Sequence, residues 1–275
     1  MLLLDHKRSL DDLAFESAIS RITLEGILKG KVEAGNDVLE KFYSYLYRNK
    51  YRVNLGIEQI VKESSSAKIF FHGSKDGIKE ITPNGSRSRC DFGPGFYVGE
   101  SFFQAASFIS DQSAGNVYLF SANVDGLKIK SFEVNSDWMM NIALYRGRLH
   151  NFEHTLTYQR IADQIKDADI IIAPIADNKM MQILLQFERG DITSKEAEHA
   201  LCSSDLGNQY VFKTQKAIDR LKPLMRLYLC EEEKKDYLNQ NKQRALLLET
   251  KLRLSKKEYR GKGLFIDEVF EDDFK

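Results

Sequence analysis

Two short segments carry residue types that can form a ligand-binding site. The first segment, residues 71–74, places His72 at the end of an apolar run and follows it with a glycine and a serine. An imidazole at the end of a strand can face a cleft, and a glycine lets a ligand approach the backbone. The second segment, residues 91–98, has the sequence Asp-Phe-Gly-Pro-Gly-Phe-Tyr-Val, so Tyr97 can offer a ring face beside the same cleft. Taken alone, each segment is also explained by a core histidine, a core aromatic ring and glycines in a turn.

Together the two segments resemble the NAD-binding half of ADP-ribosyltransferases of the diphtheria-toxin and poly(ADP-ribose) polymerase type. The chain is also similar to the bacterial DUF3990 family, a relative of these transferases, over about residues 68–222. This similarity is specific for family membership and less specific for substrate. It rests on Asp91-Phe92-Gly93-Pro94-Gly95-Phe96-Tyr97, Gln104-Ala105, Asp169-Ile170-Ile171-Ile172-Ala173-Pro174-Ile175-Ala176-Asp177-Asn178 and Asn208-Gln209-Tyr210-Val211-Phe212-Lys213-Thr214.

The resemblance implies a role for each matching residue. His72 would hydrogen-bond the adenosine ribose of NAD, and Gly73, with Ser74 beside it, would bind the nicotinamide carboxamide through its backbone. Tyr97 would stack on the nicotinamide ring and hold it ready to leave. We therefore expect NAD to lie in one crevice that the rings of His72 and Tyr97 border from two strands.

Further positions complete the expected site, and two of them, Gln209 and Ala105, depart from the most active transferases. The third catalytic position is a glutamate in those enzymes and is Gln209 here. Ala105 stands where polymerase relatives often carry a nicotinamide-binding serine, and Phe108 can supply a second aromatic wall. Arg87 and Arg89 can reach the pyrophosphate because guanidinium matches phosphate geometry, although solvated loop arginines explain them equally well.

The chemistry of such a site needs little proton transfer. Nicotinamide leaves NAD as a neutral base, so the difficult centre is the oxocarbenium-like ribose carbon, which nearby negative charge or dipoles stabilise. A carboxylate at the third position would bind the ribose 2′-hydroxyl and stabilise positive charge. Gln209 can accept the same hydrogen bond through its amide oxygen but brings only a dipole. We therefore expect slow transfer of single ADP-ribose units, or a nucleophile that the target itself activates, and no polymer elongation.

These residues predict an NAD-dependent mono-ADP-ribosyltransferase, a bacterial toxin or defence effector that modifies a protein or nucleic acid. NAD is the expected substrate, and a neutralising antitoxin or a second copy of the chain are open as partners. One alternative is a module that binds NAD or ADP-ribose without catalysis, which Gln209 makes credible. Another is a DNA-binding regulator whose C-terminal domain senses a ligand.

Two further motifs have simpler explanations. Residues 186–188 form a Gln-x-Glu sequence like the acidic motif of some toxin transferases, but they lie in an amphipathic helical pattern, so we interpret the match as a coincidence. Residues 177–179, Asp-Asn-Lys, follow an apolar strand pattern. They either line the acceptor side of the site or form a turn and a helix N-cap.

Composition excludes several classes of protein. The 275 residues include 40 Lys+Arg and 40 Asp+Glu, so bulk electrostatic coating of nucleic acid or anionic membranes is not expected. The 3 cysteines lie far apart without Cys-x-x-Cys spacing, which excludes a thiolate zinc site and favours a reducing compartment. No segment reaches the roughly 20 apolar residues of a membrane span. We expect a cytoplasmic protein without a metal or membrane partner.

The first 62 residues predict a small helical domain. Ser9 opens a capping box before a helix through Glu16, residues 18–29 form a second helix, and Asn36 caps a third helix through Tyr47. The first two helices resemble the helix-turn-helix of phage-repressor-type regulators, in which Ser20, Arg21 and Thr23 would begin the recognition helix. A docking or dimerisation module is the preferred alternative.

The rest of the chain predicts an α+β domain over residues 67–225 and a charged helical tail over residues 226–275. The resemblance implies a split antiparallel β-sheet for the α+β domain. We expect the tail to pack on its own domain rather than to bind a partner. Strands are expected at 68–71, 96–98, 117–124, 127–132, 170–175 and 210–212, and helices at 102–110, 137–146, 180–187, 194–203 and 215–221.

Overall fold

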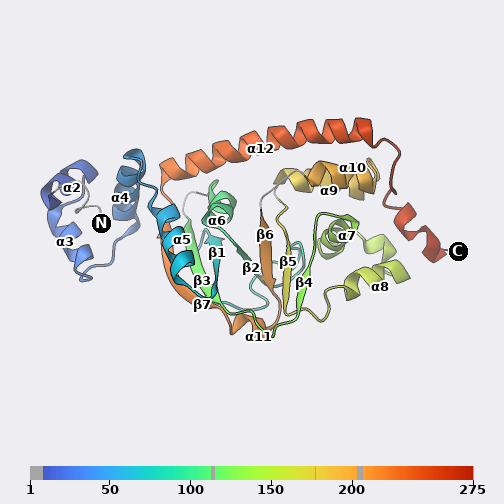
Figure 1. Ribbon diagram of the computed structural model, residues 1–275, viewed down its shortest axis with the longest axis horizontal. Coiled ribbons are helices and arrows are strands. Elements are labelled where there is room, and N and C mark those ends of the chain that lie inside the picture. The colour runs from blue at the N-terminus through green and yellow to red at the C-terminus, as the bar shows by residue number, and fades with distance from the viewer. Residues whose placement is uncertain (1–8, 113–114, 177, 203–206, 275) are drawn as a thin grey trace.

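The computed structural model describes residues 9–112, 115–176, 178–202 and 207–274 and shows an α+β protein (Figure 1). N-terminal helices precede a seven-stranded, mostly antiparallel sheet, and a long helix follows it near the C-terminus. The helices are α2 (Leu10–Ser17), α3 (Arg21–Leu28), α4 (Asn36–Arg48), α5 (Val53–Ser64), α6 (Phe102–Ile109), α7 (Ser136–Tyr145), α8 (Leu156–Asp163), α9 (Asn178–Glu188), α10 (Ser194–Leu201), α11 (Gln215–Ile218) and α12 (Glu231–Glu258), with 3-10 turns η1 (His150–Phe152) and η2 (Glu268–Phe274).

The sheet has the strand order β4-β5-β6-β2-β1-β3-β7. Its β4–β5 pair is parallel and its other pairs are antiparallel. The strands are β1 (Lys68–Ser74), β2 (Phe96–Gly99), β3 (Asn116–Ala122), β4 (Ile129–Ser131), β5 (Ile170–Pro174), β6 (Asn208–Phe212) and β7 (Lys222–Tyr228). Six of these strands lie where the sequence predicts strands, with small differences at their ends.

Each face of the sheet has its own apolar core. One face, called the helical face here, contacts helices, as Figure 1 shows for α6, α7 and α9. It includes Phe71 of β1, Val211 of β6 and Ile171 of β5. The opposite face, called the loop face, contacts α11 and the chain around Ile78, and includes the alternate residues of the same strands. Successive side chains of a strand point to opposite faces, so one residue of register decides which core a side chain joins.

The N-terminal helices follow local signals except at α4. Ser9 forms the expected capping box with Asp12 at the start of α2. The second helix is shorter than predicted, because Ser20 caps α3 and Ala18 takes a left-handed conformation at the end of α2. The predicted cap at Asn36 is wrong, since Gly35 precedes α4 and no side chain caps it. Helix α5 was not predicted.

The predicted start of the helical tail is also wrong. Residues 226–228 belong to β7, an edge strand that pairs with β3, and α12 begins only at Glu231. Helix α12 then runs along one side of the sheet domain and contacts α4, α6, α9 and α10 (Figure 1). Tyr47 of α4 donates a hydrogen bond to Asp236, and Asn54 of α5 donates one to Glu233. The tail therefore joins the N-terminal helices to the sheet domain.

Within the described ranges, no helix combines the length and the apolar character that crossing a membrane requires. Even α12, the longest helix there, is too polar to cross a bilayer.

Candidate functional site

The site begins where β1 and β2 part. Phe71 and Gly99 form the one ladder pair between these strands in the described chain, whereas β1 pairs with β3 over its whole length. Past that pair, His72 Nδ1 lies 2.7 Å from the carbonyl oxygen of Tyr97. A carbonyl can only accept, so Nδ1 carries the hydrogen and, in the neutral ring, Nε2 is left as an acceptor. Burial lowers the pKa of His72 below its ordinary value, although the hydrogen bond to Tyr97 opposes that change, and the neutral ring is therefore favoured.

The rings of His72 and Tyr97 do not border one crevice, which differs from the expectation. The His72 ring stacks on Phe96 with centroids 4.8 Å apart, and Phe96 belongs to the core of the loop face. Tyr97 is the next residue along β2 and packs against the core of the helical face. The alternation of side chains along β2 thus separates the two rings, and only the backbone of Tyr97 reaches the imidazole.

The hydroxyl of Tyr97 closes the glycine-rich turn that precedes β2. It donates a hydrogen bond of 2.7 Å to the carbonyl of Gly93 and accepts one of 3.1 Å from the amide of Phe92. Gly93 has φ of 70°, and an added Cβ would lie 2.9 Å from the Tyr145 ring, so this turn needs glycine. Burial strongly raises the pKa of Tyr97, which keeps the phenol neutral. Tyr97 therefore orders the turn that carries Asp91.

Gln209 joins Tyr97 on the helical face, because Tyr97 pairs with Val211 across β2 and β6 and Gln209 lies two residues before Val211. Its Nε2 donates to Asp91 Oδ2 at 3.0 Å and to the carbonyl of Pro174 at 3.2 Å. Arg146 at the end of α7 donates to the other oxygen, Asp91 Oδ1, from Nε at 2.9 Å and from Nη2 at 2.5 Å. The role of Asp91 could not be predicted from the sequence, because its partners are distant in the chain.

The other residues expected to bind NAD are Gly73, Ser74, Phe108 and Arg89, and each has a different environment in the structure. An added Cβ at Gly73 would lie 2.5 Å from the carbonyl oxygen of Ala105, so the close approach of α6 requires glycine there. Ser74 Oγ donates to the carbonyl of Gly77. Phe108 is 74% exposed on α6. A Cβ added to Gly147 would lie 3.7 Å from Arg89 Nε. Gly147 directly follows Arg146, which binds Asp91, so the Arg89 side chain lies near the turn that holds Asp91.

The central part of the chain matches a known protein family. The family model described as a protein of unknown function (DUF3990) matches residues 68–222, which is more than half of the chain. The chain belongs to the DUF3990 family. No curated protein and no solved structure matches it. The DUF3990 domain runs from the first residue of β1 to the first residue of β7 and contains His72, Asp91, Tyr97 and Gln209.

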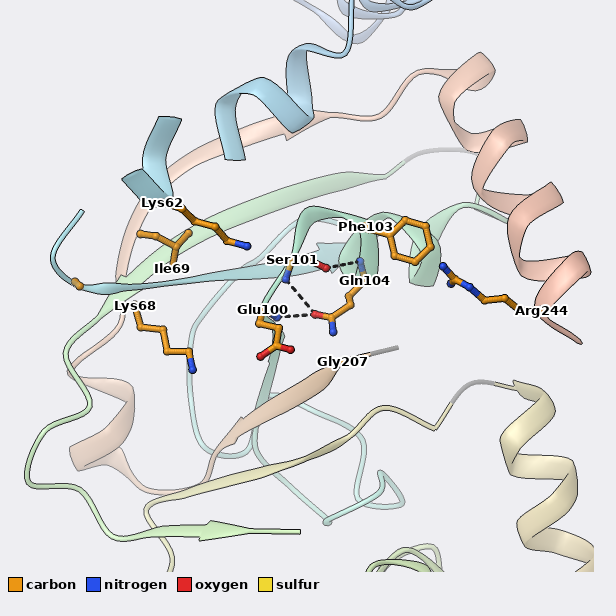
Figure 2. Close-up of a pocket in the computed structure, with 10 residues that line it drawn as sticks. Lys62, Lys68, Ile69, Glu100, Ser101, Phe103, Gln104, Gly207 and Arg244 are labelled. Atoms are coloured by element: carbon orange, nitrogen blue, oxygen red, sulfur yellow. Dashed lines mark hydrogen bonds between the residues drawn. The ribbon is translucent and has the colours of Figure 1, made fainter. Parts of the chain in front are cut away.

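A hollow of about 620 Å³ lies at the other end of β1 and β2, where the DUF3990 domain meets α5 and α12 (Figure 2). The hollow could not be predicted from the sequence, because its walls come from four separate elements, α5, β1, α6 and α12. Glu100 accepts a hydrogen bond from the amide of Asn208, so the hollow borders the start of β6, next to Gln209. Its excess of cations suits an anionic ligand. The lining residues are Lys62, Ala67, Lys68, Ile69, Glu100, Ser101, Phe103, Gln104, Gly207 and Arg244.

The Gln-x-Glu sequence lies at the end of α9 in the DUF3990 domain. Gln186 accepts a hydrogen bond of 2.8 Å from Lys256 of α12, and Phe187 is in the core. The Glu188 side chain is 6% exposed and its carboxylate lies 3.7 Å from Arg148 Nε. Burial raises the pKa of Glu188 to about 7. Of the three residues expected either at the acceptor side or in a turn, Asp177 lies outside the described residues, and Lys179 pairs with Glu249 of α12.

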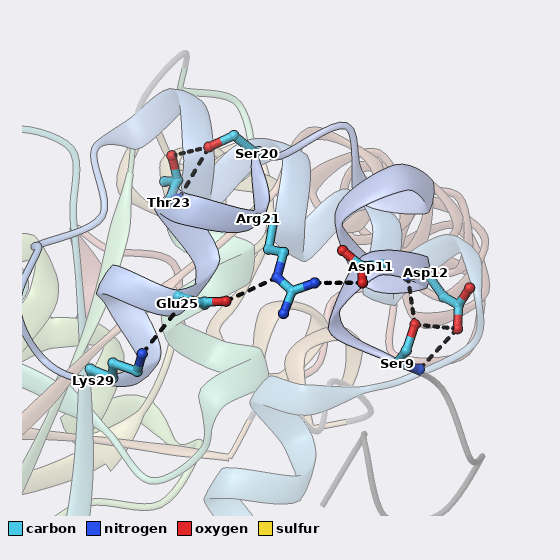
Figure 3. A network of polar contacts seen from close by, with 8 residues as sticks. All are labelled: Ser9, Asp11, Asp12, Ser20, Arg21, Thr23, Glu25 and Lys29. Atoms are coloured by element: carbon cyan, nitrogen blue, oxygen red, sulfur yellow. Dashed lines mark hydrogen bonds and ion pairs between the residues drawn. The ribbon is translucent and has the colours of Figure 1, made fainter.

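The helix-turn-helix resemblance falls on α2 and α3, outside the DUF3990 domain (Figure 3). Ser20 caps α3 through the amide of Thr23, so α3 begins at Arg21. Arg21 Nη1 binds Asp11 at 2.6 Å and its Nε binds Glu25 at 2.9 Å, as Figure 3 shows. Two carboxylates therefore hold the arginine that would face DNA, and a phosphate would have to displace them. DNA binding by this module stays a prediction.

Proposed function

We propose that the chain is an NAD-dependent mono-ADP-ribosyltransferase that modifies a macromolecular acceptor. The observation that carries the proposal is the hydrogen bond between His72 Nδ1 and the Tyr97 carbonyl, at the point where β1 and β2 part. This bond orients a neutral imidazole with an acceptor nitrogen left for a ribose hydroxyl. The resemblance of the surrounding residues to NAD-binding transferases supports the same conclusion.

In this proposal NAD crosses the sheet between β1 and β2. Its adenosine ribose binds His72 on the loop face, while the nicotinamide ribose meets Tyr97 and Gln209 on the helical face. No ladder pair joins β1 to β2 past Phe71 and Gly99 in the described chain, so a ligand can enter beside the His72–Tyr97 hydrogen bond without breaking a backbone ladder. The separation of the rings of His72 and Tyr97 is thus compatible with one extended dinucleotide.

The reaction exchanges one bond at the ribose carbon C1′. The bond between C1′ and the nicotinamide nitrogen breaks, and nicotinamide leaves as a neutral base with the bonding electron pair. C1′ then bonds to an oxygen or nitrogen of the acceptor, which loses its proton to solvent. Gln209 Oε1 accepts a hydrogen bond from the 2′-hydroxyl and directs the negative end of its dipole at the positive centre. Because a dipole stabilises less than a charge does, the transfer is slow.

Two measurements test this proposal. The first is nicotinamide release from NAD by purified protein, and the second is mass spectrometry of cellular protein and RNA after controlled expression, which detects added ADP-ribose. His72→Ala should lower both signals about a hundredfold or more, since it removes a positioning contact. His150→Ala changes an exposed histidine elsewhere and should behave as wild type. Wild-type activity in His72→Ala, with its fold intact, would refute the proposal.

A second candidate is an NAD-binding or ADP-ribose-binding module without catalysis, which the amide of Gln209 favours. Calorimetric titration with NAD separates the two candidates. Binding without nicotinamide release and without any labelled acceptor supports the binding module.

A further inference from the structure

A glutamine in a catalytic position has an ambiguity that a glutamate does not have. Rotating its terminal amide by half a turn exchanges an acceptor oxygen, at the negative end of the dipole, with a donor nitrogen at the positive end. Next to a ribose carbon that becomes positive, the oxygen would stabilise the transition state and the nitrogen would destabilise it. The function proposed above therefore requires something that keeps Gln209 Oε1 toward the ligand.

The neighbours of Gln209 supply that constraint. Its Nε2 donates to Asp91 Oδ2 and to the Pro174 carbonyl, both of which can only accept. Turning the amide over would bring its oxygen against two acceptor oxygens. Within the described residues, no group donates to Gln209 Oε1, although the residue is only 8% exposed. Both amide hydrogens are thus used inside the protein, and the oxygen is the atom left for a ligand.

Asp91 is itself fixed from a third element. Arg146, which follows α7, donates two hydrogen bonds to Asp91 Oδ1, and the Asp91 side chain is 9% exposed. Both guanidinium donors converge on Oδ1, so the charged pair occupies that oxygen and leaves Oδ2 for Gln209. The Asp91 carboxylate also polarises the amide that it binds, which makes Oε1 a stronger acceptor.

Resting on the proposed function, we infer that Asp91 is a positioning residue for Gln209. Together with Arg146 it holds the amide so that its oxygen, polarised by the carboxylate behind it, meets the ribose of NAD. The arrangement gives a glutamine part of the electrostatic effect of the glutamate found in the most active transferases.

The variant Asp91→Asn tests this inference by reversing one hydrogen bond. The asparagine oxygen should stay on Arg146, because the charged guanidinium is the stronger donor, so its NH₂ group turns toward Gln209. Gln209 then faces one donor and the Pro174 carbonyl, which is an acceptor, so its amide is no longer held in one orientation and can present its own NH₂ group to the ligand. We expect kcat for nicotinamide release to fall at least about tenfold, with KM for NAD changed less than about threefold.

The double variant Asp91→Asn with Gln209→Glu should restore activity. The introduced asparagine can donate to one oxygen of the new carboxylate, which leaves the other oxygen for the ribose. Gln209→Glu alone brings two carboxylates within hydrogen-bond distance and should be less active than the double variant. We expect the double variant to exceed Asp91→Asn in kcat by at least about tenfold.

Asp169→Asn is the matched control, because Asp169 is as buried as Asp91 but binds Thr214 and the amide of Lys128 away from Gln209. It should lower thermal stability without changing kcat. If Asp169→Asn and Asp91→Asn lower kcat equally, Asp91 has only a structural role.

The orientation of the amide can also be measured without activity. In protein labelled with ¹⁵N at glutamine side chains, the Gln209 signal is the one lost in Gln209→Glu. Wild type should show both Nε2 hydrogens protected from exchange with water, and Asp91→Asn should lose that protection. Unprotected hydrogens in wild type, or a double variant no better than Asp91→Asn, overturn the inference. If the Nε2 hydrogens are protected but the protein releases no nicotinamide, the proposed transferase activity is refuted. The inference that Asp91 positions Gln209 then still stands.

Discussion

His72 and Tyr97 are held together by one hydrogen bond of 2.7 Å, although their rings lie on opposite faces of the sheet. The bond joins the imidazole to the backbone of Tyr97, in the place where β1 and β2 no longer form a ladder. It therefore fixes the tautomer of His72 and the spacing of the two strands at the same time.

This arrangement predicts a pH dependence of stability that belongs to His72. Burial lowers its pKa below the ordinary value of 6.5, so between these two values the unfolded chain binds a proton that the folded protein does not. The stabilisation is complete above pH 6.5 and declines as the pH falls through that window. His72→Gln keeps a donor for the Tyr97 carbonyl but does not titrate.

Urea unfolding at about pH 7.5 and about pH 5.5 measures this contribution. The difference in unfolding free energy between wild type and His72→Gln should shrink at the lower pH. His150→Gln, at an exposed histidine, provides the control. A difference that is the same at both pH values would show that His72 titrates normally.

Gly73 should tolerate no side chain. A Cβ there would approach the Ala105 carbonyl to 2.5 Å, and backbone of a packed helix cannot easily yield. We expect Gly73→Ala to lower the unfolding free energy by about 1–3 kcal/mol. Gly56→Ala is the control, because an added Cβ in α5 has open space and should stabilise by about 0.5–1 kcal/mol. The denaturant midpoints of both variants measure these changes. Equal changes in midpoint for Gly73→Ala and Gly56→Ala would contradict the close approach of α6 to β1.

Glu188 should destabilise the fold as the pH rises. Its pKa is raised to about 7 from 4.5 by burial, so the folded protein binds this proton more tightly than the unfolded chain does. Its contribution to stability is therefore greatest below pH 4.5 and is lost as the pH rises to about 7. Glu188→Gln removes that loss. The unfolding free energy of Glu188→Gln minus that of wild type should therefore increase by about 3 kcal/mol as the pH rises from 4.5 to about 7.

Thermal unfolding at several pH values tests the behaviour of Glu188. Glu249→Gln, which changes an exposed ion-paired glutamate, should alter stability by less than about 1 kcal/mol throughout. A gain for Glu188→Gln that does not vary with pH would mean that the carboxylate is well solvated.

Local signals in the sequence predicted much of the architecture. Ser9 and Asp12 satisfy each other within one helical turn, so the capping box of α2 can be recognised without tertiary structure. Strand β7 could not be recognised this way, because its first five residues are exposed and its ladder exists only through β3. The charged, helix-favouring composition that follows made the whole segment resemble a tail.

The amino-acid sequence by itself determined membership of the DUF3990 family, the identity of His72, Tyr97 and Gln209, and most of the strands that carry them. The tertiary structure decided on which face of the sheet each of these side chains lies. A strand alternates its sides at every residue, so the register between β1, β2 and β6 puts His72 on one face and Tyr97 with Gln209 on the other. It also decided the contact between Asp91 and Gln209, 118 residues apart, because only packing of the turn before β2 against β6 and α7 brings the carboxylate to the amide.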